Sequence, residues 1–277
     1  MSKPIVCQSF DERHTRAIFE MCSRAAGGDE ELVKKPFIVP SLSVDSPLLL
    51  EPKLLKGILK ATRLRHPVWA VSGSLSGDVA PATLAITLVL NNAEVLASLV
   101  LVRIVSDRTP FIYGADPRSM HMRTGQVVMR GPEFSIMHAC LAQLVRFYNL
   151  PSGIGGLLSD PKACDVQASH EKTIIALMLA MAGADLVSEI PAAERVASLE
   201  QLVIGDEIVG FFIKRALDSV RVGEETLTTS FIEEVGREEL LSKKHTLKFF
   251  TKEHYVPRIT DRTAPGTWAK RGSMGLG

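Results

Sequence analysis

The sequence predicts an α/β protein of the TIM (β/α)8-barrel type, and two observations indicate that fold. Short apolar runs rich in β-branched residues alternate with longer segments of helical periodicity, which is the pattern of a parallel sheet with covering helices. The expected strands do not alternate between polar and apolar residues, as is typical of strands covered on both faces. An open doubly wound sheet is the alternative architecture.

The expected elements follow one another as strand and helix. Strands are predicted at residues 37–44, 67–72, 110–114, 152–158 and 184–190. Helices are predicted at residues 11–26, 52–64, 81–105, 132–147, 165–181 and 198–217. Residues 4–8 and 227–231 are weaker strand candidates. Because a closed barrel needs eight strands, the sequence predicts an incomplete barrel, or a barrel with units that the pattern does not reveal.

Two regions are expected from the change in composition along the chain. Residues 1–221 are predicted to form the partial barrel domain. Residues 222–277 are more charged and have fewer long apolar runs, so a loop, a surface helix and an extended C-terminal wrap are expected there.

Composition narrows the class of protein. The chain has 277 residues, of which 46% are apolar and 23% charged, enough to bury a sizeable core. The formal net charge of +1 gives no indication of a nucleic-acid or acidic-membrane partner. The four cysteines lie far apart without a CxxC pair, which disfavours a zinc site on such a pair and is typical of reduced cysteines in the cytoplasm. The N-terminus lacks the apolar core of a signal peptide.

Residues 81–105 are long and apolar enough to raise the question of a membrane span. Asn91, Asn92 and Glu94 stand at the centre of this segment. A charged residue at the bilayer midplane costs roughly 2.5–3.5 kcal/mol on insertion scales. A buried helix packed on the sheet therefore explains the segment better than a membrane span.

The stretch GIGGLLSDPKACDVQASHEKT, residues 153–173, places three glycines before a helix. A phosphate loop would need GK[ST] at the helix start or a full GxGxxG, and the stretch has neither. The glycines either allow positive φ and close backbone approach or keep space open at the mouth of the barrel, where the carboxyl ends of the strands meet. On the following helix, the apolar face is expected to consist of Val166, Ile174, Leu177 and Met181.

Other chemistries have weaker support in the sequence. The seven histidines form no HExxH or HxH pair, so no metal site is expected. No GxSxG elbow is present for a serine hydrolase. Acidic residues at a helix start, such as Asp160 and Asp165, are equally explained by the helix dipole. Aromatic residues in strands, such as Tyr113, could bind a quaternary ammonium ion by cation–π attraction, although core packing is their commoner role.

Several segments, taken in order, resemble the trimethylamine methyltransferase (MttB-type) family. They are FDERHTRAIFEM, APATLAITLVLNNAEVLASLVLVRIV, TPFIYGADPRSMHMRTG, GPEFSIMHACLAQLVRFYNLPSG, SDPKACDVQASHEKT and HTLKFF. No single motif is decisive, and their order and spacing along nearly the whole chain carry the resemblance.

The resemblance implies a TIM-barrel methyltransferase. Such enzymes move a methyl group from a methylated or quaternary amine, for example trimethylamine or glycine betaine, to the cobalt of a corrinoid carried by a separate partner protein. On this basis the expected catalytic residues are Asp160, Asp165 and Glu171. The expected substrate-binding residues are Tyr113, Glu133, Gly156, Leu158 and Gln167. Aromatic and acidic groups would hold the cationic nitrogen, and glycines would make room for it.

The sequence also departs from the family pattern. It begins well inside that pattern, and it has Leu157 and Leu158 near the position where archaeal members carry pyrrolysine, which resembles the non-pyrrolysine branch. Ser169 stands where the family usually has glycine. The alternative hypothesis is a catalytically inactive fragment, or half of a split protein, with a homo-oligomer or a partner chain supplying the missing barrel units. An unrelated barrel enzyme is a third option.

Overall fold

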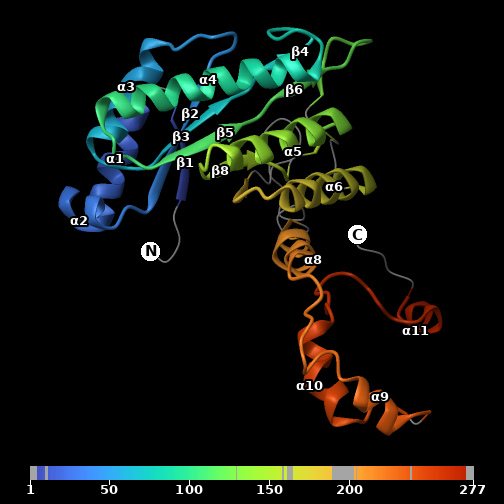
Figure 1. Ribbon diagram of the computed structural model, residues 1–277. Helices are drawn as coiled ribbons and strands as arrows, with labels where there is room; N and C mark the ends of the chain where they lie inside the picture. Colours follow the sequence, from blue (N-terminus) through green and yellow to red (C-terminus); the bar gives the residue numbers. More distant parts are fainter. Residues whose placement is uncertain are drawn as a thin grey trace. The chain divides into compact units, whose positions relative to one another are not determined.

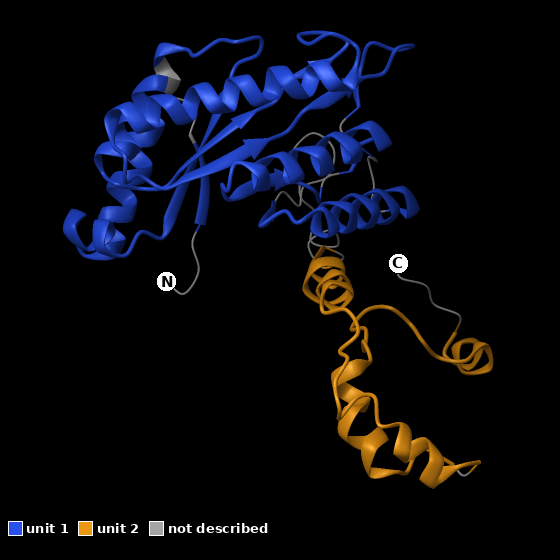
Figure 2. Cartoon of the chain, viewed as in Figure 1, with its two compact units in different colours: residues 1–197 blue, residues 198–277 orange. Residues whose placement is uncertain are grey.

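A computed structural model describes residues 5–9, 12–128, 130–157, 159–160, 165–188, 203, 205–237 and 239–272. Contacts within the chain divide it into two compact units, residues 1–197 and residues 198–277 (Figure 2). The domain boundary that the sequence predicts after residue 221 stays a prediction.

The first unit is built on a parallel sheet, which confirms the α/β class. Its strands are β1 (Ile5–Ser9), β2 (Ile38–Val44), β3 (Val68–Ser72), β5 (Phe111–Ala115), β8 (Ser152–Gly155) and β9 (Leu186–Ser188). They lie side by side in chain order, and every neighbouring pair is parallel. The weak strand candidate at residues 4–8 is confirmed as β1. Strand order and direction are consistent with part of a (β/α) barrel.

Helices connect the strands and lie against the sheet (Figure 1). They are α1 (Glu12–Ala26), α2 (Asp29–Lys34), α3 (Pro52–Arg63), α4 (Leu84–Val105), α5 (Pro132–Phe147) and α6 (Val166–Ala182). Pro52 and Pro132 stand in the first turn of α3 and α5, where a missing N–H costs little. Apart from the short α2, these helices correspond to the predicted ones.

The two faces of β2 differ in burial. Ile38, Leu42 and Val44 are buried, and Leu42 lies so close to Gly57 of α3 that a Cβ there would be 3.0 Å from its Cδ2. The alternate residues Val39 and Ser43 are half-buried and exposed. The expectation of strands covered on both faces therefore does not hold for β2, whose buried face is the one toward the helices.

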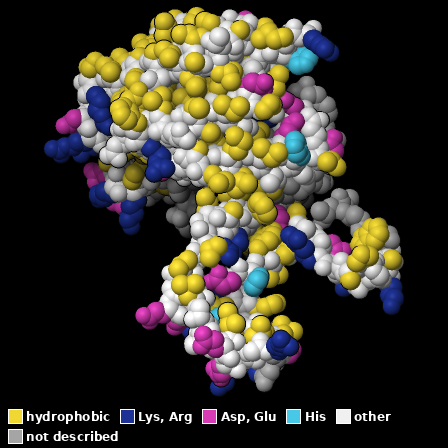
Figure 3. All heavy atoms as spheres, turned by 45° about the vertical axis from the view of Figure 1, so that its right-hand side comes forward, with side chains coloured by type: hydrophobic (Ala, Val, Ile, Leu, Met, Phe, Trp, Pro, Cys, Tyr) yellow, Lys and Arg dark blue, Asp and Glu magenta, His cyan; other side chains and the backbone are white. Residues whose placement is uncertain are grey.

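Helix α4 buries several polar residues and exposes several apolar ones, unlike an ordinary surface helix. Its buried residues include Thr87, Asn91, Glu94 and Ser98, whereas Ile86, Val89, Val100 and Ile104 are exposed. Figure 3 shows many hydrophobic side chains at the molecular surface. In the described part of the chain it is the one helix long and apolar enough to cross a membrane. Asn91 and Glu94 hydrogen-bond to Ser72 of β3. The hydroxyls of Thr87 and Ser98 donate to the carbonyls of Thr83 and Glu94.

A second, small sheet was not predicted. It consists of β4 (Leu75–Ser76), β6 (Arg118–Met120) and β7 (Val127–Val128), in the order β4-β6-β7. β4 and β6 follow the carboxyl ends of β3 and β5 closely in sequence. Segments of two or three residues carry no detectable hydrophobic period, which is why the sequence did not reveal them.

The second unit consists of helices in its described residues. They are η2 (Glu207–Ile213), a π-helix, α8 (Lys214–Leu217), α9 (Thr229–Val235), α10 (Lys244–Glu253) and α11 (Pro265–Lys270). The start of the helix predicted at residues 198–217, with its proposed cap Ser198, lies outside the described residues. The strand candidate at residues 227–231 is wrong, because Phe231 belongs to α9, where its ring stacks on His245 of α10. Residues 244–253 are likewise helical where an extended wrap was expected.

The burial of His66 predicts an acid-sensitive fold. His66 is completely buried, and neither ring nitrogen has a hydrogen-bond partner among the described residues. Burial lowers the pKa of His66, so below its ordinary value of about 6.5 the unfolded chain binds the proton more readily than the folded chain. The free energy of unfolding should therefore decline as pH falls through that value, by at most about 1.4 kcal/mol per pH unit for this group.

Urea denaturation across this pH range measures the effect. The variant His66→Leu should lose the part of the pH dependence that belongs to His66, because leucine binds no proton. An identical pH dependence in the two proteins would contradict the assignment.

Candidate functional site at the carboxyl edge of the sheet

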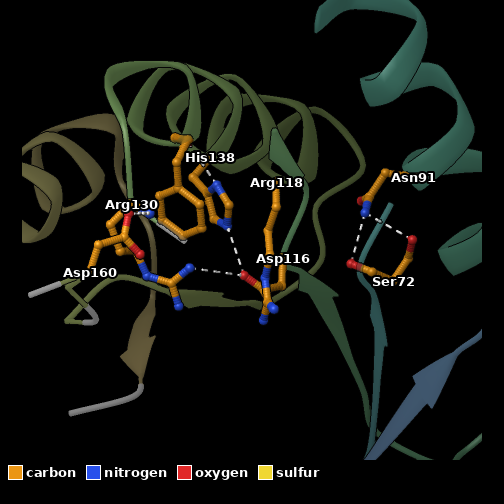
Figure 4. A network of polar contacts seen from close by, with 8 residues as sticks. Ser72, Asn91, Asp116, Arg118, Arg130, His138 and Asp160 are labelled. Atoms are coloured by element: carbon orange, nitrogen blue, oxygen red, sulfur yellow. Dashed lines mark hydrogen bonds and ion pairs between the residues drawn. The ribbon is translucent and has the colours of Figure 1, made fainter. Parts of the chain in front are cut away.

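Polar side chains gather at the edge of the sheet formed by the carboxyl ends of its strands, called the carboxyl edge below. All strands of a parallel sheet end at the same edge, so the loops after β3, β5 and β8 meet there. Figure 4 shows Arg118, Arg130 and His138 around Asp116, which directly follows β5, with Asp160 of the loop after β8 beside Arg130. Ser72 and Asn91 form a separate pair in the same view. The carboxyl edge is therefore the candidate site.

Asp116 is the centre of a buried charged cluster. It directly follows β5, is 7% exposed, and its backbone N–H donates to the carbonyl of Ser72 at the end of β3. Its carboxylate pairs with Arg118 and lies 3.8 Å from Nη1 of Arg130. His138 of α5 places Nε2 3.7 Å from Oδ1 of Asp116. Two cations and an imidazole thus surround one carboxylate.

Burial and charge act in opposite directions on this cluster. Burial alone would raise the pKa of Asp116, but the contact with His138 and the charges of Arg118 and Arg130 outweigh it and hold the pKa below its ordinary value. Burial lowers the pKa of His138, and Asp116 offsets part of that change. Nδ1 of His138 donates to the carbonyl of Phe134 at 2.8 Å, since a carbonyl only accepts. Nε2 is therefore the atom that faces Asp116.

Arg130 connects the Asp116 cluster to the loop after β8. Its guanidinium lies over the ring of Phe134, 4.2 Å from the centroid, and the same ring stacks on His138. Its backbone N–H donates to Oδ2 of Asp160 at 3.1 Å. The loop that leads into α5 and the loop after β8 are thereby held together by one residue.

The predicted catalytic residues bind backbone groups near the start of α6. Glu171 accepts a hydrogen bond from the N–H of Asp160 at 2.8 Å. Gln167 donates to the other oxygen of Glu171 at 2.6 Å. Asp165 caps α6 by accepting from the N–H of Ala168 at 3.0 Å. The structure thus brings these four predicted residues together, and each has a partner within the protein.

The other predicted residues lie apart from this group. Tyr113 is completely buried, and its hydroxyl donates to Asn92 of α4 at 3.0 Å, between the sheet and the helices. Glu133 is exposed in the first turn of α5. Leu158 lies outside the described residues. Their assignment to substrate binding stays a prediction.

The glycines in and just after β8 have two different structural roles. A Cβ on Gly153 would be 2.5 Å from the indole of Trp69, and a Cβ on Gly114 of β5 would be equally close to its Nε1. The indole therefore lies across two neighbouring strands that only glycine allows it to approach. A Cβ on Gly156 would instead meet Val187 and Leu179 of α6. Close approach to the backbone therefore explains Gly153 and Gly156, whereas the positive φ that the sequence also suggested is wrong for the glycines of this stretch.

A second buried network lies behind the carboxyl ends of β2 and β3. Nδ2 of Asn91 donates to the carbonyl and to Oγ of Ser72, at 2.8 and 2.9 Å (Figure 4). Oγ of Ser72 in turn donates to Glu94. The loop after β2 adds the hydroxyl of Ser46, 2.9 Å from Glu94, and the N–H of Leu48 at 2.8 Å. Glu94 thus fastens β3 and the loop after β2 to α4.

Sequence reasoning missed Asp116, Arg118, Arg130 and His138. The only signal for the first two was their position in GADPR directly after a predicted strand. Arg130 and His138 carry no motif, and the chain brings them to Asp116 only by folding. No group of three or more His, Cys, Asp or Glu side chains in the described residues is arranged to hold a metal ion.

Comparison with known proteins gives a consistent family match. The sequence matches the family model described as Trimethylamine methyltransferase (MTTB) over residues 1–276. Trimethylamine methyltransferase MttB of Methanosarcina thermophila is 37% identical over 254 residues, which are 90% of this chain and 52% of that protein. Glycine betaine methyltransferase of Desulfitobacterium hafniense is 32% identical over 255 residues, 91% of this chain and 53% of that protein. The chain spans about half the length of the curated relatives it matches.

The position of Trp69 predicts that Gly153 tolerates no side chain. Gly153→Ala should destabilise the protein by about 1–3 kcal/mol, because the new Cβ overlaps the indole. Chemical denaturation measures this cost. Gly223→Ala is the matched control, since a Cβ there meets no atom within 4 Å. In a Trp69→Leu background the Gly153→Ala substitution should cost much less, and an equal cost in both backgrounds would contradict the contact.

We expect the substitution Asp116→Asn to destabilise the protein strongly, although it changes the side chain little. Asp116→Asn removes the negative charge that faces Arg118 and Arg130 but keeps the size of the side chain. Removing one partner of a buried ion pair costs about 3–5 kcal/mol, and we expect the low end because Arg118 is partly exposed. Asp78→Asn on the exposed surface should change stability by less than about 0.5 kcal/mol. Equal melting temperatures for the two variants would contradict the role of the cluster.

Proposed function

Because the chain belongs to the trimethylamine methyltransferase (MTTB) family, we propose that it takes part in moving a methyl group from a methylated or quaternary amine to the cobalt of a corrinoid. The match over residues 1–276, together with relatives named trimethylamine and glycine betaine methyltransferases, carries this proposal. The corrinoid is the methyl acceptor and belongs to a separate partner protein. We place the reaction in the cytoplasm, in agreement with the widely spaced cysteines.

We assign the amine to the carboxyl edge of the sheet. Active sites of (β/α) barrels lie at this end, and the polar residues described above gather there. Asp160, Asp165 and Glu171 add negative charge near this edge, which favours a cationic amine. Their hydrogen bonds to backbone groups fix the loops that would shape the binding place. The proposed substrate-side residues remain Tyr113, Glu133, Gly156, Leu158 and Gln167.

The main contribution of the protein to this reaction is to position the amine. A docked corrinoid partner would supply reduced cobalt as the nucleophile that accepts the methyl group, and the demethylated amine would leave with the bonding electron pair. The residues of this chain would hold the amine with one methyl group directed outward from the edge, because in-line geometry supplies much of the rate. A rigid edge, fastened through Asp116 and Glu94, suits that task.

A second candidate function is a non-catalytic or half-barrel module. In the described part of the chain, β1 and β9 each pair with one neighbour, and the curated relatives are about twice as long as this chain. A partner polypeptide, or a second copy of the chain, would then supply further barrel units.

The test is methylation of free cob(I)alamin by the purified chain. With trimethylamine, glycine betaine and related quaternary amines, the cobalt spectrum should change to that of methylcobalamin for at least one amine. Asp116→Asn should lower this rate about tenfold or more, since small displacements of positioning groups are costly.

Reaction mixtures without protein are the control. No methylcobalamin with any amine would contradict the catalytic proposal for the chain by itself. Activity that appears only after a complementary polypeptide is added would favour the half-barrel function.

A further inference from the structure

Glu94 is a buried carboxylate in an otherwise uncharged part of α4. Its exposed fraction is 2%, and no other charged residue occurs between Leu84 and Val102. Burying a charged group without a compensating charge is costly in folding free energy. The position of Glu94 therefore calls for an explanation beyond packing.

Every group that hydrogen-bonds to the carboxylate of Glu94 acts as the donor. Asn91 donates to Oγ of Ser72, which leaves the hydroxyl hydrogen of Ser72 for Glu94. The N–H of Leu48 can only donate, and the hydroxyl of Ser46 lies 2.9 Å from Oε2. A carboxylate, which only accepts, matches this set of donors. Neutral dipoles thus hold Glu94, and they bring no positive charge with them.

Asp116 and Glu94 differ in the charge of the groups around them. Asp116 is balanced by two arginines. Among the residues that the structure describes, by comparison, no lysine, arginine or histidine forms an ion pair with Glu94. Basic side chains therefore balance the charge of Asp116, whereas only neutral groups hydrogen-bond to the carboxylate of Glu94.

We propose that Glu94 is a specificity-determining residue whose buried negative charge favours a positively charged methylated amine over a neutral molecule of the same shape. This inference rests on the proposed function. Glu94 lies directly behind Ser72, the last residue of β3, and the loop after β2. It acts through its charge, without contact with the amine. Because the group is buried, salt screens this attraction less than it screens surface charges.

A purely structural role for Glu94 makes a different prediction. The same hydrogen bonds fasten the loop after β2 to α4, and such fastening affects every ligand equally. Glu94→Gln removes the charge but keeps the shape and an accepting oxygen. Ligands that differ only in charge therefore separate the two roles.

The experiment compares binding of matched ligands to the full chain by calorimetry. Tetramethylammonium and choline are the cationic probes. Tert-butanol and 3,3-dimethyl-1-butanol are the neutral probes of matching size, with carbon in place of the charged nitrogen. Glu94→Gln should weaken binding of the cationic probes by about three- to tenfold. Binding of the neutral probes should change by less than about twofold. Asp107→Asn, an exposed change of the same charge just beyond the C-terminal end of α4, should leave all four affinities unchanged.

The outcomes distinguish the inference from the function on which it rests. If Glu94→Gln weakens cationic and neutral probes alike, or neither, the inference is wrong and the proposed function is unaffected. If the unchanged protein binds the neutral probes as tightly as the cationic ones, or binds no cationic probe, the inference is overturned, and the methylcobalamin assay decides the proposed function separately. A loss confined to the cationic probes, with Asp107→Asn unaffected, supports Glu94 as the source of specificity.

Discussion

Parallel pairing of the strands is the constraint on which the rest of the first unit depends. It collects the carboxyl ends of β2, β3, β5 and β8 at one edge, and each of these strands is followed by backbone that must be turned back into a helix. The polar groups of these turns need partners away from bulk water. Asp160, Glu171 and Glu94 supply these partners. The same side chains therefore hold the loops in place and form the polar site at this edge.

The two buried carboxylates show how the same residue type acts differently by environment. Arginines and an imidazole balance Asp116 and connect the strand end to α5. Hydrogen bonds from neutral groups surround Glu94, and they explain why α4 turns its polar side toward the sheet. On the opposite face, Gly114 and Gly153 let the Trp69 indole lie flat across β5 and β8. The carboxyl edge thus combines a close-packed interior with charged groups of both signs.

Much of the fold follows from local patterns in the sequence. The long helices and the central strands were predicted within a few residues, because their apolar runs and proline positions are local properties. The apolar face predicted for α6 was wrong: Val166 and Met181 are exposed, and Ala168, Lys172, Ile175 and Leu179 are buried instead. A helix with apolar residues on every side carries too weak a period to show which face packs. The short strands β4, β6 and β7 escaped detection for a similar reason.

The sequence by itself determined the alternation of strands and helices, the family resemblance and the importance of the glycine-rich stretch around Gly153. Each of these rests on residues that are neighbours in the chain or on motifs in a fixed order. Only the tertiary structure decided that Arg130 and His138 converge on Asp116, and that Glu94 reaches Ser72 and the loop after β2. Such contacts join residues separated by many positions, and their energies depend on burial and distance, which exist only once the chain is folded.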